Sequence, residues 1–256
     1  YVQWFIENAK SNQADHIVFL GDWYECRSAI NVSTLNYSHK AATMLNEMGL
    51  PVFFIIGNHD LYQRHTRDVY APITFNEFSN FRLITTPTIV PEIGKGGSVL
   101  SPFLFSEEYP SLMEYLKYDT WFGHFEFKDF VITGHSMKMQ HGPDPTMFAG
   151  PTHIFSGHFH KRQTLRNITY IGNTFPTSFG DVNDFDRGMM IYEHDSNTPT
   201  FIDWEECPKY VQQPWSLMKL LDFSLPPNSR VKIVLDQDVT YDDLTVLRDE
   251  IVEKNK

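Results

Sequence analysis

The sequence predicts an α/β fold in which short apolar strands alternate with helices. Two continuously apolar runs, Ile17–Leu20 and Val52–Ile56, flank a segment with helical spacing. Runs of this kind are typical of parallel strands that are covered on both faces. Each run ends in a glycine followed by polar residues, and such loops build ligand sites at the carboxyl ends of strands. The pattern therefore predicts a sheet covered by helices, with a polar site along one edge.

The other elements can be placed in order along the chain. Residues 2–11 carry apolar side chains at helical spacing and predict the first helix. Ser33 or Thr34 can cap a second helix, which Gly49 and Pro51 bring to an end. Further strands are expected at residues 81–85, 98–104, 119–122, 130–133, 153–156, 169–171 and 188–192, with one helix near residues 111–118.

The pattern of elements restarts near the end of the chain. The turn at Leu225–Asn228 is followed by a strand-like run at 231–235 and a helix-like segment at 241–254. We expect a main domain at residues 1–222 and the beginning of a small α/β domain at 223–256. The chain opens on a helix and closes on a helix without a partner, so we expect segments to be missing at both ends.

Composition excludes several classes of protein. Of 256 residues, 41% are hydrophobic and 15% aromatic, which is too apolar for a disordered chain. A net charge of −11 argues against a protein coated in basic surface for gripping nucleic acid, although a local basic groove stays possible. Cys26 and Cys207 lack zinc-like spacing and are expected as free thiols. No run spans a membrane and no signal peptide is evident, so we expect no membrane association and a cytoplasmic location.

Three motifs deliver polar side chains directly after apolar strands. Each one alone has an ordinary explanation as a turn or a surface histidine, but the set in this order predicts a shared metal site. Oxygen and nitrogen donors without thiolates suit Mn²⁺, Fe or Zn²⁺. A pair of such ions about 3.5–4 Å apart can bind both the attacking hydroxide and the phosphate oxygens of a phosphoester. The motifs are Gly21-Asp22, Gly57-Asn58-His59-Asp60 and Gly157-His158-Phe159-His160.

These motifs, with a Gly-His between the second and third, resemble the calcineurin-like metallophosphoesterases. The resemblance implies a sandwich of two central β-sheets flanked by helices and a centre of two divalent metal ions, with Mn²⁺ expected. It also implies a role for each residue of the motifs. Asp22 would bridge the metals, Asn58, His124 and His158 would complete one of them, His160 would bind the other, His59 would protonate the leaving oxygen, and Asp60 would orient His59.

Two features of the motif set leave alternatives open. Gly123-His124 and Gly134-His135 both follow strand-like runs, and we expect His124 to be the ligand because its spacing and the following Phe125-Glu126 resemble the phage members of the family. Family members also begin with an Asp-x-His motif on a first strand, which this chain lacks. We expect truncation to explain this difference, the alternative being a degenerate site.

A second resemblance narrows the expected activity. The segments Tyr170–Thr174, Thr177–Asp181 and Asp186–Gly188 are similar to the stretch after the metal motifs in SbcD-type DNA repair nucleases, with short loops like those of the phage recombination members. The resemblance implies a DNA exo- and endonuclease subunit, a homodimer in complex with an SbcC-like SMC-family ATPase, in the host cytoplasm if phage-encoded. The alternatives are a small-molecule phosphodiesterase and a metal-poor, non-catalytic scaffold.

Overall fold

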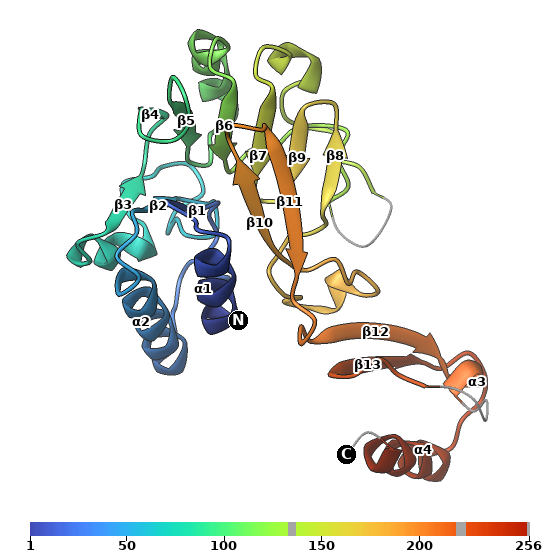
Figure 1. Ribbon diagram of the computed structural model, residues 1–256. Helices are drawn as coiled ribbons and strands as arrows, with labels where there is room; N and C mark the ends of the chain where they lie inside the picture. The colour runs from blue at the N-terminus through green and yellow to red at the C-terminus, as the bar shows by residue number, and fades with distance from the viewer. Residues whose placement is uncertain (133–136, 219–223, 255–256) are drawn as a thin grey trace.

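A computed structural model describes residues 1–132, 137–218 and 224–254 of the chain (Figure 1). The strands form two main sheets and two smaller ones. The first main sheet is parallel and consists of β1 (Ile17–Phe19), β2 (Val52–Ile55) and β3 (Phe81–Ile84), in that order. The second has the order β4 (Thr88–Val90), β5 (Ser98–Ser101), β6 (Thr120–Gly123), β7 (His153–Ser156), β9 (Ile168–Tyr170) and β8 (Gln163–Leu165).

Two two-stranded sheets and the helices complete the structure. The strands β10 (Gly188–Glu193) and β11 (Thr198–Asp203) form an antiparallel pair, and β12 (Lys209–Pro214) pairs in parallel with β13 (Ser229–Val234). The α-helices are α1 (Val2–Ser11), α2 (Val32–Asn46), α3 (Trp215–Met218) and α4 (Tyr241–Lys254). Short 3₁₀ helices are η1 (Ala71–Glu77), η2 (Ser106–Tyr115), η3 (Pro145–Phe148) and η4 (Phe179–Asp181).

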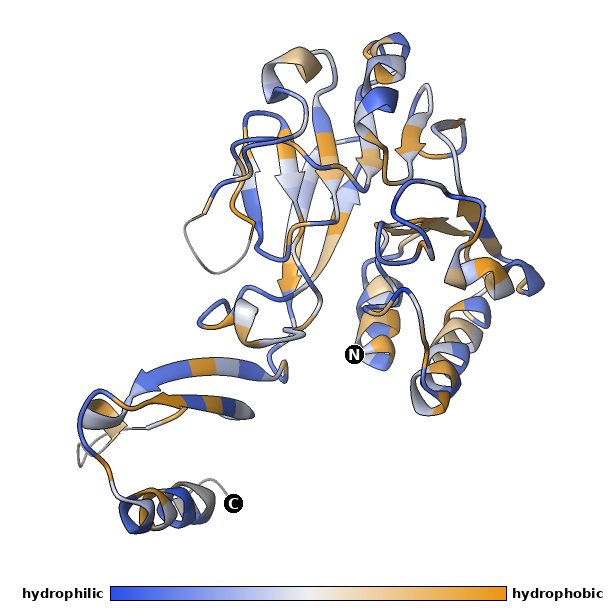
Figure 2. Ribbon diagram, turned by 180° about the vertical axis from the view of Figure 1, so that it is seen from behind, coloured by the Kyte–Doolittle hydropathy of each residue, from blue (hydrophilic) through white to orange (hydrophobic). Residues whose placement is uncertain are grey.

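Apolar side chains fill three layers around the two main sheets. Residues of α1, α2 and η1 pack on one face of the first sheet, with Ala42 and Phe54 among the buried members. A second layer joins the two sheets and contains Phe53 and Phe122. A third, rich in aromatic rings such as Phe127, lies on the six-stranded sheet. The helices show hydrophilic and hydrophobic residues together in Figure 2, as expected for helices with one face on a core. This arrangement is the expected calcineurin-like α/β fold.

The strand directions bring the predicted motifs together. β1 and β2 run parallel, with Ile17 opposite Val52, so their carboxyl ends open on one edge of the first sheet. β5, β6, β7 and β9 are likewise parallel neighbours in the second sheet. Backbone bonds then tie successive strand ends together, for example from the Gly157 N–H to the Gly123 carbonyl at 3.0 Å. The loops after four different strands therefore share one edge of the molecule.

Several local expectations need correction. The cap of α2 is Asn31, whose side chain accepts from the Thr34 N–H at 2.8 Å, and not Ser33 or Thr34. The helix expected near 111–118 is the 3₁₀ helix η2, because Pro110 inside it has no N–H to donate to an α-helical bond. Residues 130–132 form no strand and contribute only an isolated bridge between Val131 and Lys138; residue 133 lies outside the described residues.

The end of the chain forms a small α/β unit around β12 and β13 (Figure 1). The parallel pairing of these strands places residues from before position 222 beside residues from after it. Trp215, Met218 and Leu247 form the buried centre of this unit. The boundary at 222/223 stays a prediction. Among the described residues, no helix combines the length and the apolar character needed to cross a membrane.

Candidate metal centre

Four of the expected ligands meet where the two main sheets adjoin. Asp22, His124 and His158 follow β1, β6 and β7, and one ligand atom from each lies within 4.8 Å of the other two. The amide oxygen of Asn58, which follows β2, lies 2.9 Å from both His124 Nε2 and His158 Nδ1. Residues far apart in the sequence are thus gathered into one cluster. His135, the rival of His124, lies outside the described residues.

Glycines allow the loops to approach so closely. Gly21 has a φ of +93°, and a Cβ atom on it would lie 2.4 Å from His124 Nδ1. A Cβ on Gly57 would lie 2.2 Å from Asp22 Oδ1. Both distances are far below van der Waals contact, so any larger residue would push the ligands apart. The glycine in each motif is therefore required by the packing of one loop against the next.

Two of the clustered residues have backbone conformations that are rare for their type. Asp22 has a φ of +59° and His158 a φ of +87°. Non-glycine residues in this region cost on the order of 1–3 kcal/mol each and persist where the surroundings enforce them. For Asp22, the enforcing contact is the bond from its own N–H to Asp60 Oδ2 at 2.9 Å. Strain at two expected ligands is typical of a functional site.

Hydrogen bonds outside the cluster determine which nitrogen of each histidine faces inward. His124 is fully buried, and its Nδ1 donates to the Leu20 carbonyl at 2.6 Å, which leaves Nε2 facing Asp22 Oδ2 at 3.1 Å. His158 Nε2 donates to Glu126 Oε2 at 3.1 Å, which leaves Nδ1 facing inward. Two imidazole nitrogens, a carboxylate oxygen and an amide oxygen therefore converge. Four such acceptors, with both imidazoles held by hydrogen bonds through their other nitrogens, fit a divalent cation.

The electrostatics of the cluster agree with this interpretation. Burial alone would raise the pKa of Asp22, but the neighbouring His124 and the His59 N–H lower it to about 2. Burial alone would lower the pKa of His124, but Asp22 raises it, so a proton competes with a cation for Nε2. Burial lowers the pKa of His158 despite its bond to Glu126, which favours the neutral imidazole that binds metal. The cluster thus combines a charged carboxylate with one histidine whose pKa is raised and one whose pKa is lowered.

The two orientations of the Asn58 amide suit different occupants of the centre. With its oxygen turned inward, the oxygen faces the two imidazoles and the nitrogen faces a guanidinium nitrogen of Arg27. Turned by 180°, the nitrogen donates to His124 Nε2 and His158 Nδ1 at 2.9 Å, and the oxygen accepts from Arg27 at 3.0 Å. A cation at the centre requires the first orientation, because only the oxygen can bind it.

His160 belongs to a neighbouring network. Within the described residues it is not part of the Asp22, His124 and His158 group. Its Nδ1 donates to Asp181 Oδ1 at 2.9 Å, and this bond raises the pKa of His160. Arg187, almost fully buried, donates to the His160 carbonyl at 2.8 Å. The bond to Asp181 leaves Nε2 of His160 as the nitrogen able to bind a second ion.

The two expected catalytic residues have different surroundings. His59 is half-buried, and its Nδ1 donates to the Glu25 carbonyl at 2.8 Å. Asp60 is buried, and its carboxylate accepts from four backbone N–H groups, two at 2.9 Å, one at 3.0 Å and one at 3.3 Å. The resemblance implied that Asp60 orients His59; the hydrogen bonds of Asp60 run to the backbone of the two loops, so any effect on the His59 ring acts through the loop that carries it. The four donors are the N–H groups of Asp22, Trp23, Tyr24 and Gly57.

Three residues with a place in the site had no role in the sequence-based prediction. Glu126 holds His158, Arg27 contacts Asn58, and Arg187 supports His160. Glu126 lies two positions after His124, and this closeness in the sequence is the feature that could have pointed to it. The site residues that the arginines contact, Asn58 for Arg27 and His160 for Arg187, are distant in the sequence, so no local pattern marks these contacts.

The fold and this centre define a metal-binding phosphoesterase. The chain belongs to the calcineurin-like phosphoesterase family, whose model matches residues 1–162. Members of this family are hydrolases that use divalent metal ions. The chain is also similar to exonuclease subunit 1 of Enterobacteria phage T4, with 27% identity over 204 residues. This alignment covers 77% of the chain and 58% of the phage protein, so the chain spans less than two thirds of that relative.

Proposed function

We propose that this chain is a metal-dependent DNA exo- and endonuclease subunit that hydrolyses phosphodiesters with two divalent ions, Mn²⁺ in particular. The observation that carries the proposal is the convergence of four acceptors from Asp22, Asn58, His124 and His158 beside the half-buried His59. Such a cluster supports an enzyme over a metal-poor scaffold. The similarity to a phage protein named as an exonuclease subunit supports DNA as the substrate.

Each side chain has a task in this proposal. The four clustered residues hold one cation, and His160, positioned by Asp181, contributes to the second. Bound cations would supply charge stabilisation for the phosphate and activation of water. Because His59 donates through Nδ1 to Glu25, its Nε2 is the atom that exchanges a proton with the leaving sugar oxygen.

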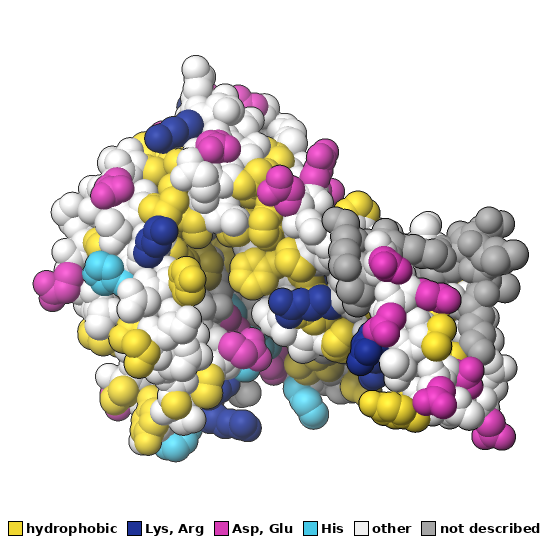
Figure 3. Space-filling model, turned by 90° about the horizontal axis from the view of Figure 1, so that it is seen from below, with side chains coloured by type: hydrophobic (Ala, Val, Ile, Leu, Met, Phe, Trp, Pro, Cys, Tyr) yellow, Lys and Arg dark blue, Asp and Glu magenta, His cyan; other side chains and the backbone are white. Residues whose placement is uncertain are grey.

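A small-molecule phosphodiesterase is the second candidate, and the charge distribution favours it. The net charge is −11, and in Figure 3 the Lys and Arg side chains of the face seen from below are scattered among acidic and apolar ones. No continuous basic band crosses the described part of that face. A nuclease with this surface must bind DNA through a few local cations, a bound metal pair or a partner subunit.

The test compares two substrates with the full-length protein. Wild type should cleave linear DNA in the presence of Mn²⁺, and His59→Ala should lower kcat by about 10²–10⁴-fold. His39→Ala, at an exposed position on α2, is the matched control and should keep wild-type activity. Hydrolysis of bis-p-nitrophenyl phosphate without DNA cleavage, even with an ATPase subunit present, would move the assignment to the small-molecule enzyme. Inactivity on both substrates would favour the scaffold.

The proposal extends to assembly and domain structure. We propose residues 1–222 as the nuclease domain and residues 223–256 as the beginning of a capping domain that guides DNA. We also propose a homodimer that binds an SbcC-like SMC-family ATPase, which the word "subunit" in the relative's name supports. Co-purification of the two full-length proteins, followed by mass measurement in solution, tests this assembly. A monomer that binds no ATPase would contradict it.

A further inference from the structure

A buried hydroxyl on α2 faces the loop that follows β1. Ser38 is 6% exposed and shares the buried face of α2 with Ala42 and Leu45. This face packs on the apolar layer of the first sheet, where an apolar side chain is the usual choice. A polar group buried in such a layer persists when hydrogen bonds satisfy it. The partners of Ser38 therefore indicate what a serine does at this position.

Within the described residues, both hydrogen bonds of this hydroxyl run to the loop after β1. Trp23 donates from its indole N–H to Ser38 Oγ at 2.7 Å, and the hydroxyls of Tyr24 and Ser38 share a bond of 2.7 Å. A hydroxyl in a helix commonly bonds to its own helix instead. Thr43 of α2 does so, because it donates to the His39 carbonyl one turn earlier at 2.9 Å. Ser38 thus connects α2 to two consecutive residues of the loop.

The two anchored residues lie between two positions of the site. Asp22, directly before Trp23, is an expected metal ligand. Glu25, directly after Tyr24, provides the carbonyl that accepts from His59 Nδ1 at 2.8 Å. A shift of this segment would therefore move an expected ligand and the acceptor that orients the expected proton donor.

The segment is held from two elements of the fold. Asp60 accepts from the N–H groups of Asp22, Trp23 and Tyr24, and these bonds join the backbone of the segment to the loop after β2. Ser38 adds bonds to two side chains of the segment and joins it to α2. The φ of +59° at Asp22 is a conformation that persists where the surroundings enforce it. The contacts to α2 are part of those surroundings.

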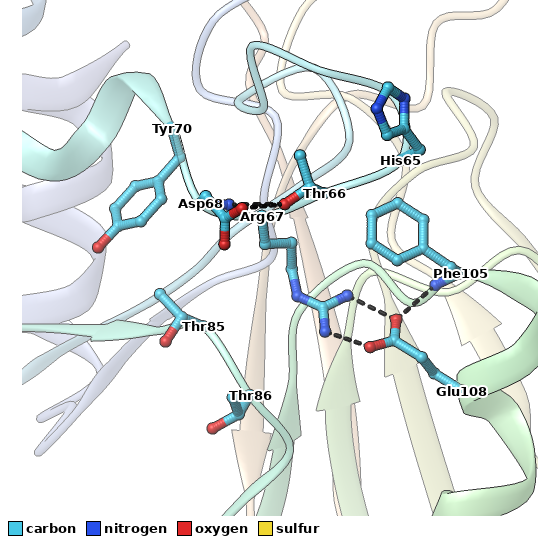
Figure 4. Close-up of a pocket in the computed structure, with 9 residues that line it drawn as sticks. All are labelled: His65, Thr66, Arg67, Asp68, Tyr70, Thr85, Thr86, Phe105 and Glu108. Carbon is cyan, nitrogen blue, oxygen red and sulfur yellow. Dashed lines mark hydrogen bonds and ion pairs between the residues drawn. The ribbon is translucent and has the colours of Figure 1, made fainter.

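The loop after β2 has a side-chain anchor of its own. Arg67, which borders a hollow of about 540 Å³, forms two bonds to the carboxylate of Glu108 and donates to the Phe103 carbonyl at 3.0 Å (Figure 4). These bonds fix the loop to η2. For the loop after β1, the corresponding anchor is the Ser38 hydroxyl of α2.

We propose that Ser38 is a positioning residue for the metal centre. Through Trp23 and Tyr24, its hydroxyl fixes a segment that carries a metal ligand at one end and the acceptor of the His59 ring N–H at the other. Ser38 acts through these two residues and not by touching the cation or the substrate. This inference rests on the proposed metal-dependent function and adds to it a residue outside the motifs.

Calorimetric binding of Mn²⁺ to the full-length protein tests this role without turnover. Ser38→Ala should weaken Mn²⁺ binding about tenfold, because the groups that hold a metal ligand set its affinity. Ser98→Ala is the matched control. Ser98 is 1% exposed and donates to the Ile93 carbonyl at 2.9 Å, at the amino end of β5 and opposite the edge that carries the site. Both variants lose a buried hydroxyl and should melt at a lower temperature, but only Ser38→Ala should lose Mn²⁺ affinity.

A second measurement follows the His59 side of the segment. At saturating Mn²⁺, kcat for bis-p-nitrophenyl phosphate should fall about 10–100-fold in Ser38→Ala, since a small misplacement of a reacting group has an effect of this size. Ser98→Ala should keep the wild-type value. Equal Mn²⁺ affinity and equal kcat in the two variants would overturn the positioning role.

Tyr24→Phe tests the same bond from the side of the loop. It removes one of the two partners of Ser38 and should lower Mn²⁺ affinity in part, whereas Tyr37→Phe, at a position 72% exposed on α2, should leave it unchanged. This pair also decides the question if Ser38→Ala does not fold. Ser38→Ala should cost less affinity in the Tyr24→Phe background than in wild type, because residues that share a bond are not additive. Fully additive losses would overturn an action through Tyr24.

The two proposals fail in different ways. Wild type that cleaves DNA, with Ser38→Ala and Tyr24→Phe matching their controls, would overturn the role of Ser38 and leave the nuclease intact. Wild type that binds Mn²⁺ but cleaves no DNA, with weaker binding in Ser38→Ala, would overturn the nuclease and keep the role of Ser38. Wild type that binds no Mn²⁺ would overturn both.

Discussion

Replacing Arg187 with methionine should strongly destabilise the protein. Arg187 is the buried cation of the described residues, with 1% of its side chain exposed. It pairs with Asp184 at 2.9 Å, lies 3.7 Å from Asp181, and donates to the His160 carbonyl at 2.8 Å. The side chains of Asp181 and Asp184 are themselves only 1% and 10% exposed. Arg187→Met fills a similar volume but leaves two carboxylates and a carbonyl in place without their cation.

The magnitude follows from these contacts. Removing one partner of a buried ion pair costs about 3–5 kcal/mol, because the remaining charge stays out of water. We expect the free energy of unfolding at pH 7 to fall by this amount, and the melting temperature to fall by on the order of 10 °C. Burial raises the pKa of Asp184 although Arg187 opposes it, so the variant should protonate its carboxylates more readily. The loss of stability should therefore shrink as the pH falls.

Urea denaturation of the full-length protein measures this effect. Arg82→Met is the control, because Arg82 and Glu92 pair at 3.1 Å with side chains 50% and 42% exposed. An exposed pair contributes about 0–1 kcal/mol, so the control should unfold close to wild type. An Arg187→Met variant within about 1 kcal/mol of Arg82→Met would refute the assignment of a buried, charge-compensating role to Arg187.

Two further predictions concern the surroundings of the centre. Glu126→Ala removes the partner of His158 Nε2. In calorimetry this variant should bind Mn²⁺ about 10–100-fold more weakly than wild type, with little change in the melting temperature. Unchanged affinity would show that Glu126 does not orient His158. Glu108→Gln should lower the free energy of unfolding at pH 7 by about 1.5 kcal/mol. Arg67 lowers the pKa of Glu108 in the folded protein. The stabilisation by this pair is therefore present above the ordinary glutamate pKa and is lost as the pH falls through the lower pKa of the folded state. An equal loss of stability in the variant at pH 7 and in acid would contradict this prediction.

The sequence predicted the apolar strands of the fold better than the polar ones. β1, β2 and β7 lie close to their expected places, because each is a run of mostly apolar residues that the sequence shows directly. β8 and β12 had no such signal. β8 lies at the edge of its sheet with mostly exposed residues, and β12 carries polar residues and a proline, so both depend on their partners for pairing.

The residues of the candidate site also fall into those that the sequence could predict and those that it could not. Asp22, Asn58, His124 and His158 could be proposed because each follows a glycine or strand end that places it at a shared edge. Residues that contact the site from a distant part of the sequence could not be proposed in this way. Arg187 reaches the backbone of His160 from 27 positions away, and its charge has meaning only once Asp181 is known to be buried beside it. Such partners are defined by packing, and packing has no short sequence pattern.

His59 and Asp60 show why adjacent motif residues need not share a task. The His59 ring is half-buried and makes one bond to a carbonyl, so its other nitrogen can meet a substrate. Burial and the charge of Asp22 raise the pKa of Asp60 to about 7, while the N–H donors of Gly57 and Tyr24 favour its charged form. These bonds join the loop after β1 to the loop after β2, and those two loops carry Asp22 and Asn58. The separation of two expected ligands is therefore determined by a carboxylate whose hydrogen bonds all run to backbone within the described chain.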